Sequence, residues 1–181
     1  MRGRTRVIYN PVEEARPRHA HTDDRPVTFG FVGRLGADKG IVTLLRAFAA
    51  ADIGDAQLVI AGRGAEATTI EAAAGADARI DYRGWVSGAE KAALFDEELD
   101  CLVVPSQWAD PAPLVVNEAR SRGLAVIGTT AGGIPAVVAP ACEPLLVATD
   151  QVAALGGAAA GRGGARGGGR PAAPPRPRPS G

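Results

Sequence analysis

The fold of this 181-residue chain can be read first from Val27-Thr-Phe-Gly-Phe-Val32, followed by Gly33-Arg-Leu-Gly-Ala-Asp-Lys-Gly40. The first segment is a short apolar run, typical of a buried strand, and glycines end it. Apolar residues then recur at i, i+3, i+4 and i+7, which places them on one face of a helix: Ile41, Leu44, Leu45 and Phe48. The stretch therefore predicts a strand, a glycine-containing turn and a helix.

The same unit recurs along the chain. Further strands are predicted at 57–61, 80–83, 100–104, 124–127 and 144–147, and helices near 65–74, 88–97 and 111–122. Ser87 and Glu90 have the spacing of a capping box before the second of these helices, and Gly123 is expected to end the third. Continuous apolar strands that alternate with helices predict an open α/β sheet of parallel strands, covered by helices on both faces. Ligands of such sheets bind beyond the carboxyl ends of the strands.

Composition and charge argue against several classes of protein. Five arginines lie in 156–181, so the first 155 residues carry 15 basic and 20 acidic side chains, and a nucleic-acid partner is not expected. No apolar run has the length of a transmembrane segment. The two cysteines stand outside any metal or redox motif, which favours reduced thiols in a cytoplasmic protein, with Cys101 filling the core.

The chain divides into three parts. Residues 1–26 are predicted to be a linker, because they are rich in charge and proline and show no sustained period. Residues 27–155 are the predicted domain. Residues 156–181 contain only Gly, Ala, Arg, Pro and Ser, so they are expected to be disordered. Two origins of this tail stay open: a natural extension, or a shifted reading frame in GC-rich DNA.

Arg34 and Lys39 bracket the loop after the first strand, where Gly33 and Gly36 are expected to allow a tight turn. Two cations beside a helix N-terminus favour a phosphate site. The alternative is a pair of solvated surface cations. The loop matches neither the P-loop pattern nor the dinucleotide-binding fingerprint.

Asp110 and Glu118 lie eight residues apart on the helix predicted after the strand at 100–104. Eight helical residues rise about 12 Å, and both carboxylates can face one groove. They would then accept hydroxyls from the two ends of a sugar nucleotide. Alternatively, Asp110 caps the helix with Pro111 in its first position, and Glu118 is an ordinary solvated carboxylate.

The loop from Thr129 to Pro135 contains Gly132 and Gly133 and precedes another possible helix start. A phosphate or sugar contact is one interpretation of this N–H-rich turn. A plain loop is the other.

In order, these pieces resemble the C-terminal half of a GT-B glycosyltransferase, specifically retaining family 4. The resemblance covers residues 7–150. Its motifs are Gly33-Arg-Leu…Lys39-Gly40, Leu58-Val-Ile-Ala-Gly-Arg-Gly64, Gly84-Trp-Val86, Val104-Pro-Ser106, Trp108-Ala-Asp-Pro-Ala-Pro-Leu114 to Glu118-Ala119, Gly123-Leu-Ala-Val-Ile127 and Gly132-Gly-Ile-Pro135.

The resemblance implies a Rossmann-like domain that binds a nucleotide-sugar donor for hexosyl transfer without a metal or other cofactor. Arg34 and Lys39 would hold the diphosphate and stabilise the leaving nucleotide. Asp110 and Glu118 match the family's pair of acids, the first facing the donor sugar and the second the ribose; these four residues are the implied catalytic set. Gly33, Gly132 and Gly133 are implied donor contacts, and residues near Gly84-Trp85 would lie beside the base.

Three departures from the family pattern stand out. The first acid is Asp rather than Glu, and Ala136 stands where the family usually has Glu. The N-terminal acceptor domain is absent from these 181 residues, so we expect the chain to bind a nucleotide sugar but to be inactive alone. A separate acceptor domain is then a possible partner.

Two other functions are weighed. One is a non-catalytic nucleotide-binding or protein-interaction module that uses the same face. The other is a GT-B-like nucleotide-sugar epimerase, for which no catalytic acid pair can be assigned.

Overall fold

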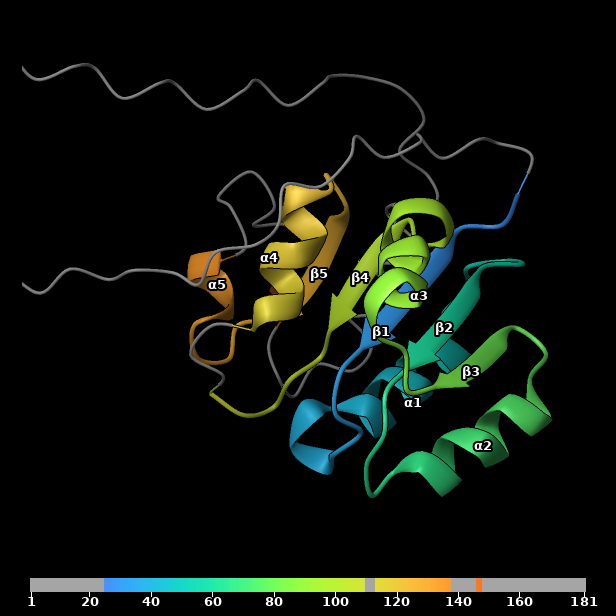
Figure 1. Ribbon diagram of the computed structural model, residues 1–181. Coiled ribbons are helices and arrows are strands. Elements are labelled where there is room, and N and C mark those ends of the chain that lie inside the picture. Colours follow the sequence, from blue (N-terminus) through green and yellow to red (C-terminus); the bar gives the residue numbers. More distant parts are fainter. Residues whose placement is uncertain (1–24, 110–112, 138–145, 148–181) are drawn as a thin grey trace, which may run out of the picture.

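The computed structural model describes residues 25–109, 113–137 and 146–147. They form one parallel sheet of six strands in the order β3-β2-β1-β4-β5-β6 (Figure 1). The strands are β1 (Thr28–Val32), β2 (Gln57–Ala61), β3 (Ile80–Gly84), β4 (Cys101–Val104), β5 (Ala125–Thr129) and β6 (Leu146–Val147). The α-helices are α1 (Ile41–Ala50), α2 (Ala67–Ala76), α3 (Gly88–Ala93), α4 (Leu114–Ser121) and α5 (Ile134–Val137).

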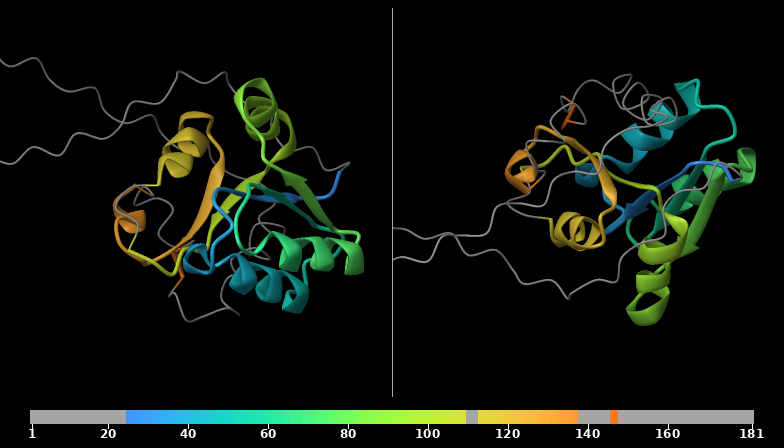
Figure 2. Two further views of the ribbon diagram at one scale, coloured as in Figure 1. Left: turned by 60° about the horizontal axis from the view of Figure 1, so that its bottom comes forward. Right: turned by 90° about the horizontal axis from the view of Figure 1, so that it is seen from above.

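Helices cover both faces of the sheet (Figure 2), which explains why its strands are continuously apolar. Phe29 and Phe31 of β1 pack with α1 and α2 on one face. Leu102 and Val104 of β4 pack with α4 and the residues that follow α3 on the other face. The central strands β2 and β4 thus send alternate side chains into two separate cores, as the pleat requires.

The strand order contains a reversal beside β1. From β1 the chain runs outward through β2 to β3, and it then returns to place β4 on the other side of β1. Phe29 pairs with Cys101, and Gly30 with Leu102, across this junction. At such a reversal the helices leave the sheet toward opposite faces, so a crevice opens at the carboxyl ends of the two strands.

The predicted open α/β sheet is confirmed, and so is the predicted position of every strand to within two residues. Gly123 follows α4 with a φ of 72°, as expected for a helix stop. Cys101 is buried in the core, as expected, and its thiol donates a weak hydrogen bond to the Leu102 carbonyl. Among the described residues, every helix is too short or too polar to cross a membrane.

Two local expectations are wrong. The helix predicted from residue 111 begins at Leu114, with Pro113 in the capping position, so Asp110 does not cap it. Ser87 does precede α3, but its side chain makes no capping hydrogen bond. The tight turn expected around Gly33 and Gly36 is present, since the N–H of Gly36 donates to the Arg34 carbonyl at 3.1 Å and the Gly36 carbonyl accepts from the N–H of Lys39 at 2.9 Å. The positive φ angle in this loop belongs to Gly40, at 71°.

The predicted helix over 88–97 is also interrupted. Its α-helical part ends at Ala93, and Leu94–Glu98 continue as a π-helical turn. This turn buries Leu94 and Phe95, which pack in the same core as Leu102 and Val104 of β4. The linker at 1–24, the tail at 148–181 and Asp110 lie outside the described residues.

Candidate active site

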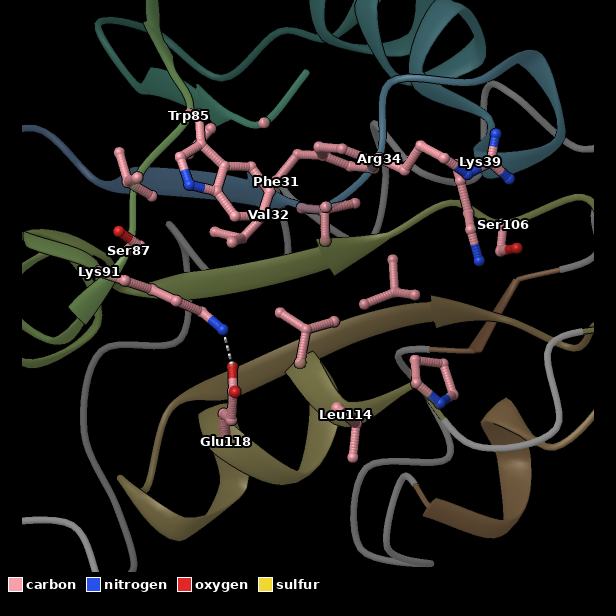
Figure 3. Close-up of a pocket in the computed structure, with 18 of the residues that line it drawn as sticks. Phe31, Val32, Arg34, Lys39, Trp85, Ser87, Lys91, Ser106, Leu114 and Glu118 are labelled. Atoms are coloured by element: carbon pink, nitrogen blue, oxygen red, sulfur yellow. Dashed lines mark ion pairs between the residues drawn. The ribbon is translucent and has the colours of Figure 1, made fainter. Parts of the chain in front are cut away.

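A cavity of about 490 Å³ lies at the strand-order reversal. Its floor is formed by the carboxyl ends of β1, β2 and β4. Its walls come from the loop after β1, from the start of α3 and from one side of α4 (Figure 3). The cavity is therefore assembled from five chain segments that only the fold brings together.

The loops after β1 and β4 are fastened to each other at the edge of this cavity. The carbonyl oxygen of Asp38 accepts hydrogen bonds from the backbone N–H groups of Gln107, at 2.9 Å, and Trp108, at 3.2 Å. The Thr129 hydroxyl donates to the carbonyl of Ser106 at 2.6 Å, which ties the same loop to β5. The buried Ser106 side chain lines the cavity. Hydrogen bonds thus join the loop after β1, the loop after β4 and the end of β5 around the cavity.

Two cations occupy the end of the cavity that lies beside β1. Arg34 and Lys39 both line it, and Figure 3 shows them on the same side as Ser106. Arg34 also forms an ion pair with Asp38 at 2.5 Å, and its side chain is 60% exposed. The hydrogen bond from Arg34 holds the pKa of the Asp38 carboxyl below its usual value. Arg34 is therefore oriented by Asp38 while remaining accessible to a ligand.

An acid and a base from facing helices meet at the other end. Nζ of Lys91, on α3, lies 2.6 Å from Oε2 of Glu118, on α4. Both residues line the cavity and point toward one another (Figure 3). Glu118 is thus not the fully solvated helix carboxylate of the alternative interpretation, since its side chain is 28% exposed.

An aromatic side chain stands at the mouth on the same side as Lys91. Trp85 follows β3, lines the cavity and is 57% exposed. The Arg63 guanidinium lies 4.8 Å from the centroid of its ring, which is a cation–π arrangement. An exposed indole at a cavity mouth offers a flat apolar surface on which a planar ring can stack.

The predicted site residues are distributed unevenly. Gly33, Arg34, Lys39 and Glu118 all line the cavity. Gly132 and Gly133 lie in the loop after β5, one strand farther from the reversal, and the cavity lining among the described residues does not include them. Asp110 falls in the undescribed segment 110–112. The roles implied for these seven residues stay predictions.

Sequence reasoning did not single out Lys91, and it named Ser106 only as part of the Val104-Pro-Ser106 motif. Lys91 sits in an alanine- and glutamate-containing helix with nothing nearby in sequence to mark it. Its partner Glu118 is on another helix, so no local spacing relates the two. Ser106 carried a weak signal, because it directly follows the exit of a predicted strand.

The family model described as "Glycosyl transferases group 1" matches residues 26–160. No curated protein sequence matches.

Solved structures share the fold. The apo form of the lipopolysaccharide outer core galactosyltransferase WaaB superposes with a TM-score of 0.74 at 24% identity, over 86% of this chain and 46% of that one. Anabaena HepE in complex with UDP and glucose superposes with a TM-score of 0.65 at 19% identity, over 75% of this chain and 38% of the HepE chain. Sucrose-phosphate synthase from Thermosynechococcus elongatus superposes with a TM-score of 0.64 at 31% identity, over 75% of this chain and 35% of the synthase chain.

These neighbours are glycosyltransferases of the GT-B type, and the expected Rossmann-like fold of one GT-B half is confirmed. The chain spans less than half the length of each of the three.

Proposed function

Because this chain belongs to the group 1 glycosyl transferases, we propose that its cavity binds the nucleoside diphosphate of a nucleotide-sugar donor for hexosyl transfer. The observation that carries the proposal is the polarity of the cavity. Arg34 and Lys39 stand at one end, and Glu118 and Trp85 at the other. A nucleoside diphosphate has the matching polarity, with an anionic group at one end and a hydroxyl-bearing ribose and a planar base at the other.

The two cations are assigned to the diphosphate. Arginine and lysine form strong charge-assisted hydrogen bonds to phosphate oxygens. During transfer the nucleotide departs with its negative charge, and fixed cations stabilise that charge without a metal ion. Binding is therefore expected to persist in the presence of a chelator. The N-terminal end of α4, where Pro113 and Leu114 line the cavity, adds the partial positive charge of a helix N-terminus beside the same anion.

Glu118 is assigned to the ribose and Trp85 to the base. A carboxylate accepts hydrogen bonds from vicinal hydroxyls, and Glu118 presents one from the wall formed by α4. Trp85 lies on the same side of the cavity and offers a stacking surface (Figure 3). HepE, which shares the fold, was solved in complex with UDP and glucose, and this supports a nucleotide at the corresponding face.

The remaining assignments follow the family resemblance. Asp110 faces the donor sugar, Gly33, Gly132 and Gly133 contact the donor through their backbones, and the chemistry is that of retaining family 4. Transfer also needs an acceptor domain, which the longer neighbours have room for, since each is more than twice the length that this chain matches. We therefore assign donor binding to this chain and transfer to its combination with such a domain.

Isothermal titration calorimetry with UDP and GDP, in the presence of EDTA, tests the phosphate assignment. Replacing Arg34 or Lys39 by Ala removes a charge-assisted hydrogen bond worth about 1.5–3 kcal/mol, so the affinity should fall roughly tenfold or more. Arg46→Ala is the control, because Arg46 is exposed on α1 and the same amount of charge is lost outside the cavity. Equal affinities for wild type, Arg34→Ala and Lys39→Ala would remove the assignment.

A further inference from the structure

We infer that Lys91 is a positioning residue, which holds the Glu118 carboxylate in place for the ribose hydroxyls of the nucleotide. The inference rests on the proposed function, because it assumes that Glu118 meets a ribose. It adds a residue that no sequence motif marks and assigns the end of α3 to recognition of the sugar of the nucleotide.

The first observation is the ion pair itself. Lys91 Nζ and Glu118 Oε2 are 2.6 Å apart, and the two side chains are only 31% and 28% exposed. Oε2 is buried and has no hydrogen-bond partner beyond this ion pair among the described residues. Lys91 therefore supplies the balancing charge that a partly buried carboxylate needs. An ion pair shielded in this way is also weakened less by salt than one on the open surface.

The second observation is that Lys91 is itself held. Its ammonium lies 5.9 Å from the ring centroid of Phe95, and the Arg122 guanidinium lies 5.6 Å from the same ring. Phe95 is 1% exposed, so the ring is a fixed part of the core. The ring belongs to the π-helical turn that follows α3, four residues after Lys91. Both cations are thereby attracted to one immobile aromatic group.

The third observation is that the backbone of Glu118 is fixed from the opposite direction. Arg122 donates one hydrogen bond to the carbonyl of Glu118 at 3.2 Å and another to Asp96 of the π-helical turn at 2.9 Å. The α3 end and α4 are thus joined twice, once through the Glu118 side chain and once through its backbone. This arrangement leaves Glu118 little freedom before any ligand enters.

The chemical consequence concerns acceptor capacity. An ionised carboxylate has two oxygens and about four lone-pair sites, so pairing Oε2 with Lys91 leaves capacity for a ligand hydroxyl. A fixed acceptor binds more tightly than a mobile one, since no rotamer freedom is lost on binding. Without Lys91 the carboxylate loses both its balancing charge and its orientation. The loss should therefore appear in hydroxyl recognition rather than in phosphate binding.

The test compares ribose with dideoxyribose ligands on the full 181-residue chain. Affinities of wild type, Lys91→Met, Lys91→Arg and Glu118→Gln are measured for UDP and 2′,3′-dideoxy-UDP, and for the corresponding guanosine pair. Lys91→Met should weaken the ribose nucleotide about tenfold, the magnitude of one hydrogen bond to a charged group, and the dideoxy nucleotide less than twofold. Lys91→Arg should retain most of the preference for the ribose nucleotide over the dideoxy nucleotide. In the Glu118→Gln background, adding Lys91→Met should change this preference little.

The outcomes separate the inference from the proposed function. Equal weakening of both ligands by Lys91→Met, as direct phosphate binding or a general loss of structure would cause, overturns the inference, and so does an unchanged preference. A wild-type protein that binds none of the four nucleotides, or binds ribose and dideoxyribose equally, overturns the assignment of Glu118 and the inference with it. Arg46→Met is the control for loss of one charge. Lys91→Gln carries the test if circular dichroism shows that Lys91→Met is unfolded.

Discussion

At the scale of single residues, Gly40 shows most directly how the cavity edge is built. It has a φ of 71° and joins the short 3₁₀ turn Ala37–Lys39 to α1. A Cβ at this position would overlap the carbonyl oxygen of Pro105, in the loop after β4. The absence of a side chain therefore allows the two loops that flank the strand-order reversal to touch. The glycines singled out from sequence, Gly33 and Gly36, have no such requirement for φ.

Alanine substitution at Gly40 and Gly54 measures this close approach. Gly54 has a similar φ of 59°, but nothing lies within 4 Å of its added Cβ. Gly54→Ala should cost only the left-handed conformation, about 1–2 kcal/mol of unfolding free energy. Gly40→Ala should cost a further 1–3 kcal/mol or so, because the loops must separate. Urea denaturation followed by circular dichroism checks this; equal losses at both sites would show that the loops can move apart freely.

At the scale of secondary-structure elements, β1 and β4 are clamped at the edge opposite the cavity. The Asp100 carboxylate accepts hydrogen bonds from Arg25 at 2.6 and 2.9 Å and from the backbone N–H of Thr28 at 2.8 Å. Its side chain is 9% exposed. Because β1 and β4 are the strands between which the crevice opens, this clamp holds the two halves of the sheet together at the end where no ligand enters.

Asp100→Ala should therefore destabilise the protein by about 2–3 kcal/mol, since it leaves Arg25 and the Thr28 N–H without their shared acceptor. The matched control is Asp81→Ala on β3, which breaks an exposed ion pair with Arg83 and should cost about 0–1 kcal/mol. Thermal and urea unfolding of both variants measure the difference. A loss at Asp100 no larger than the loss at Asp81 would mean that the clamp is not a stabilising feature of the sheet.

At the scale of the whole molecule, the described residues line the cavity in which we propose that the donor binds. The chain matches 46%, 38% and 35% of the three solved glycosyltransferases, so their remaining lengths have no counterpart in these 181 residues. A site that binds a donor but lacks the second reactant is expected to bind without turnover, because transfer requires both substrates to be held in reacting geometry.

We therefore expect the chain alone to transfer no sugar from UDP-glucose or GDP-mannose to a panel of saccharide acceptors, although we expect it to bind the nucleotides. A mass-spectrometric assay of acceptor products measures this, with a full-length group 1 glycosyl transferase as the positive control. Any product that accumulates with time and protein concentration, and that Arg34→Ala abolishes, would show that these residues carry a complete active site.

Much of the fold could be predicted from local pattern. The period of apolar residues reports which side chains are buried, and burial is decided largely within each element, so the strands were predicted to within two residues. The position of Arg34 and Lys39 at the cavity could also be predicted, because ligands of parallel sheets bind at the carboxyl ends of the strands. Helix boundaries that depend on contacts with distant residues could not be predicted, as the start of α4 at Leu114 shows.

The sequence by itself determined the elements, their alternation and the residue types that each strand end presents. The tertiary structure alone decided the strand order, and with it the neighbourhood of β1 and β4. Because of that order, Arg34 and Glu118 line the same cavity, and Lys91 forms an ion pair with Glu118. The physical reason is that periodicity is a property of neighbouring residues along the chain, whereas ion pairs between helices depend on how the whole sheet is assembled.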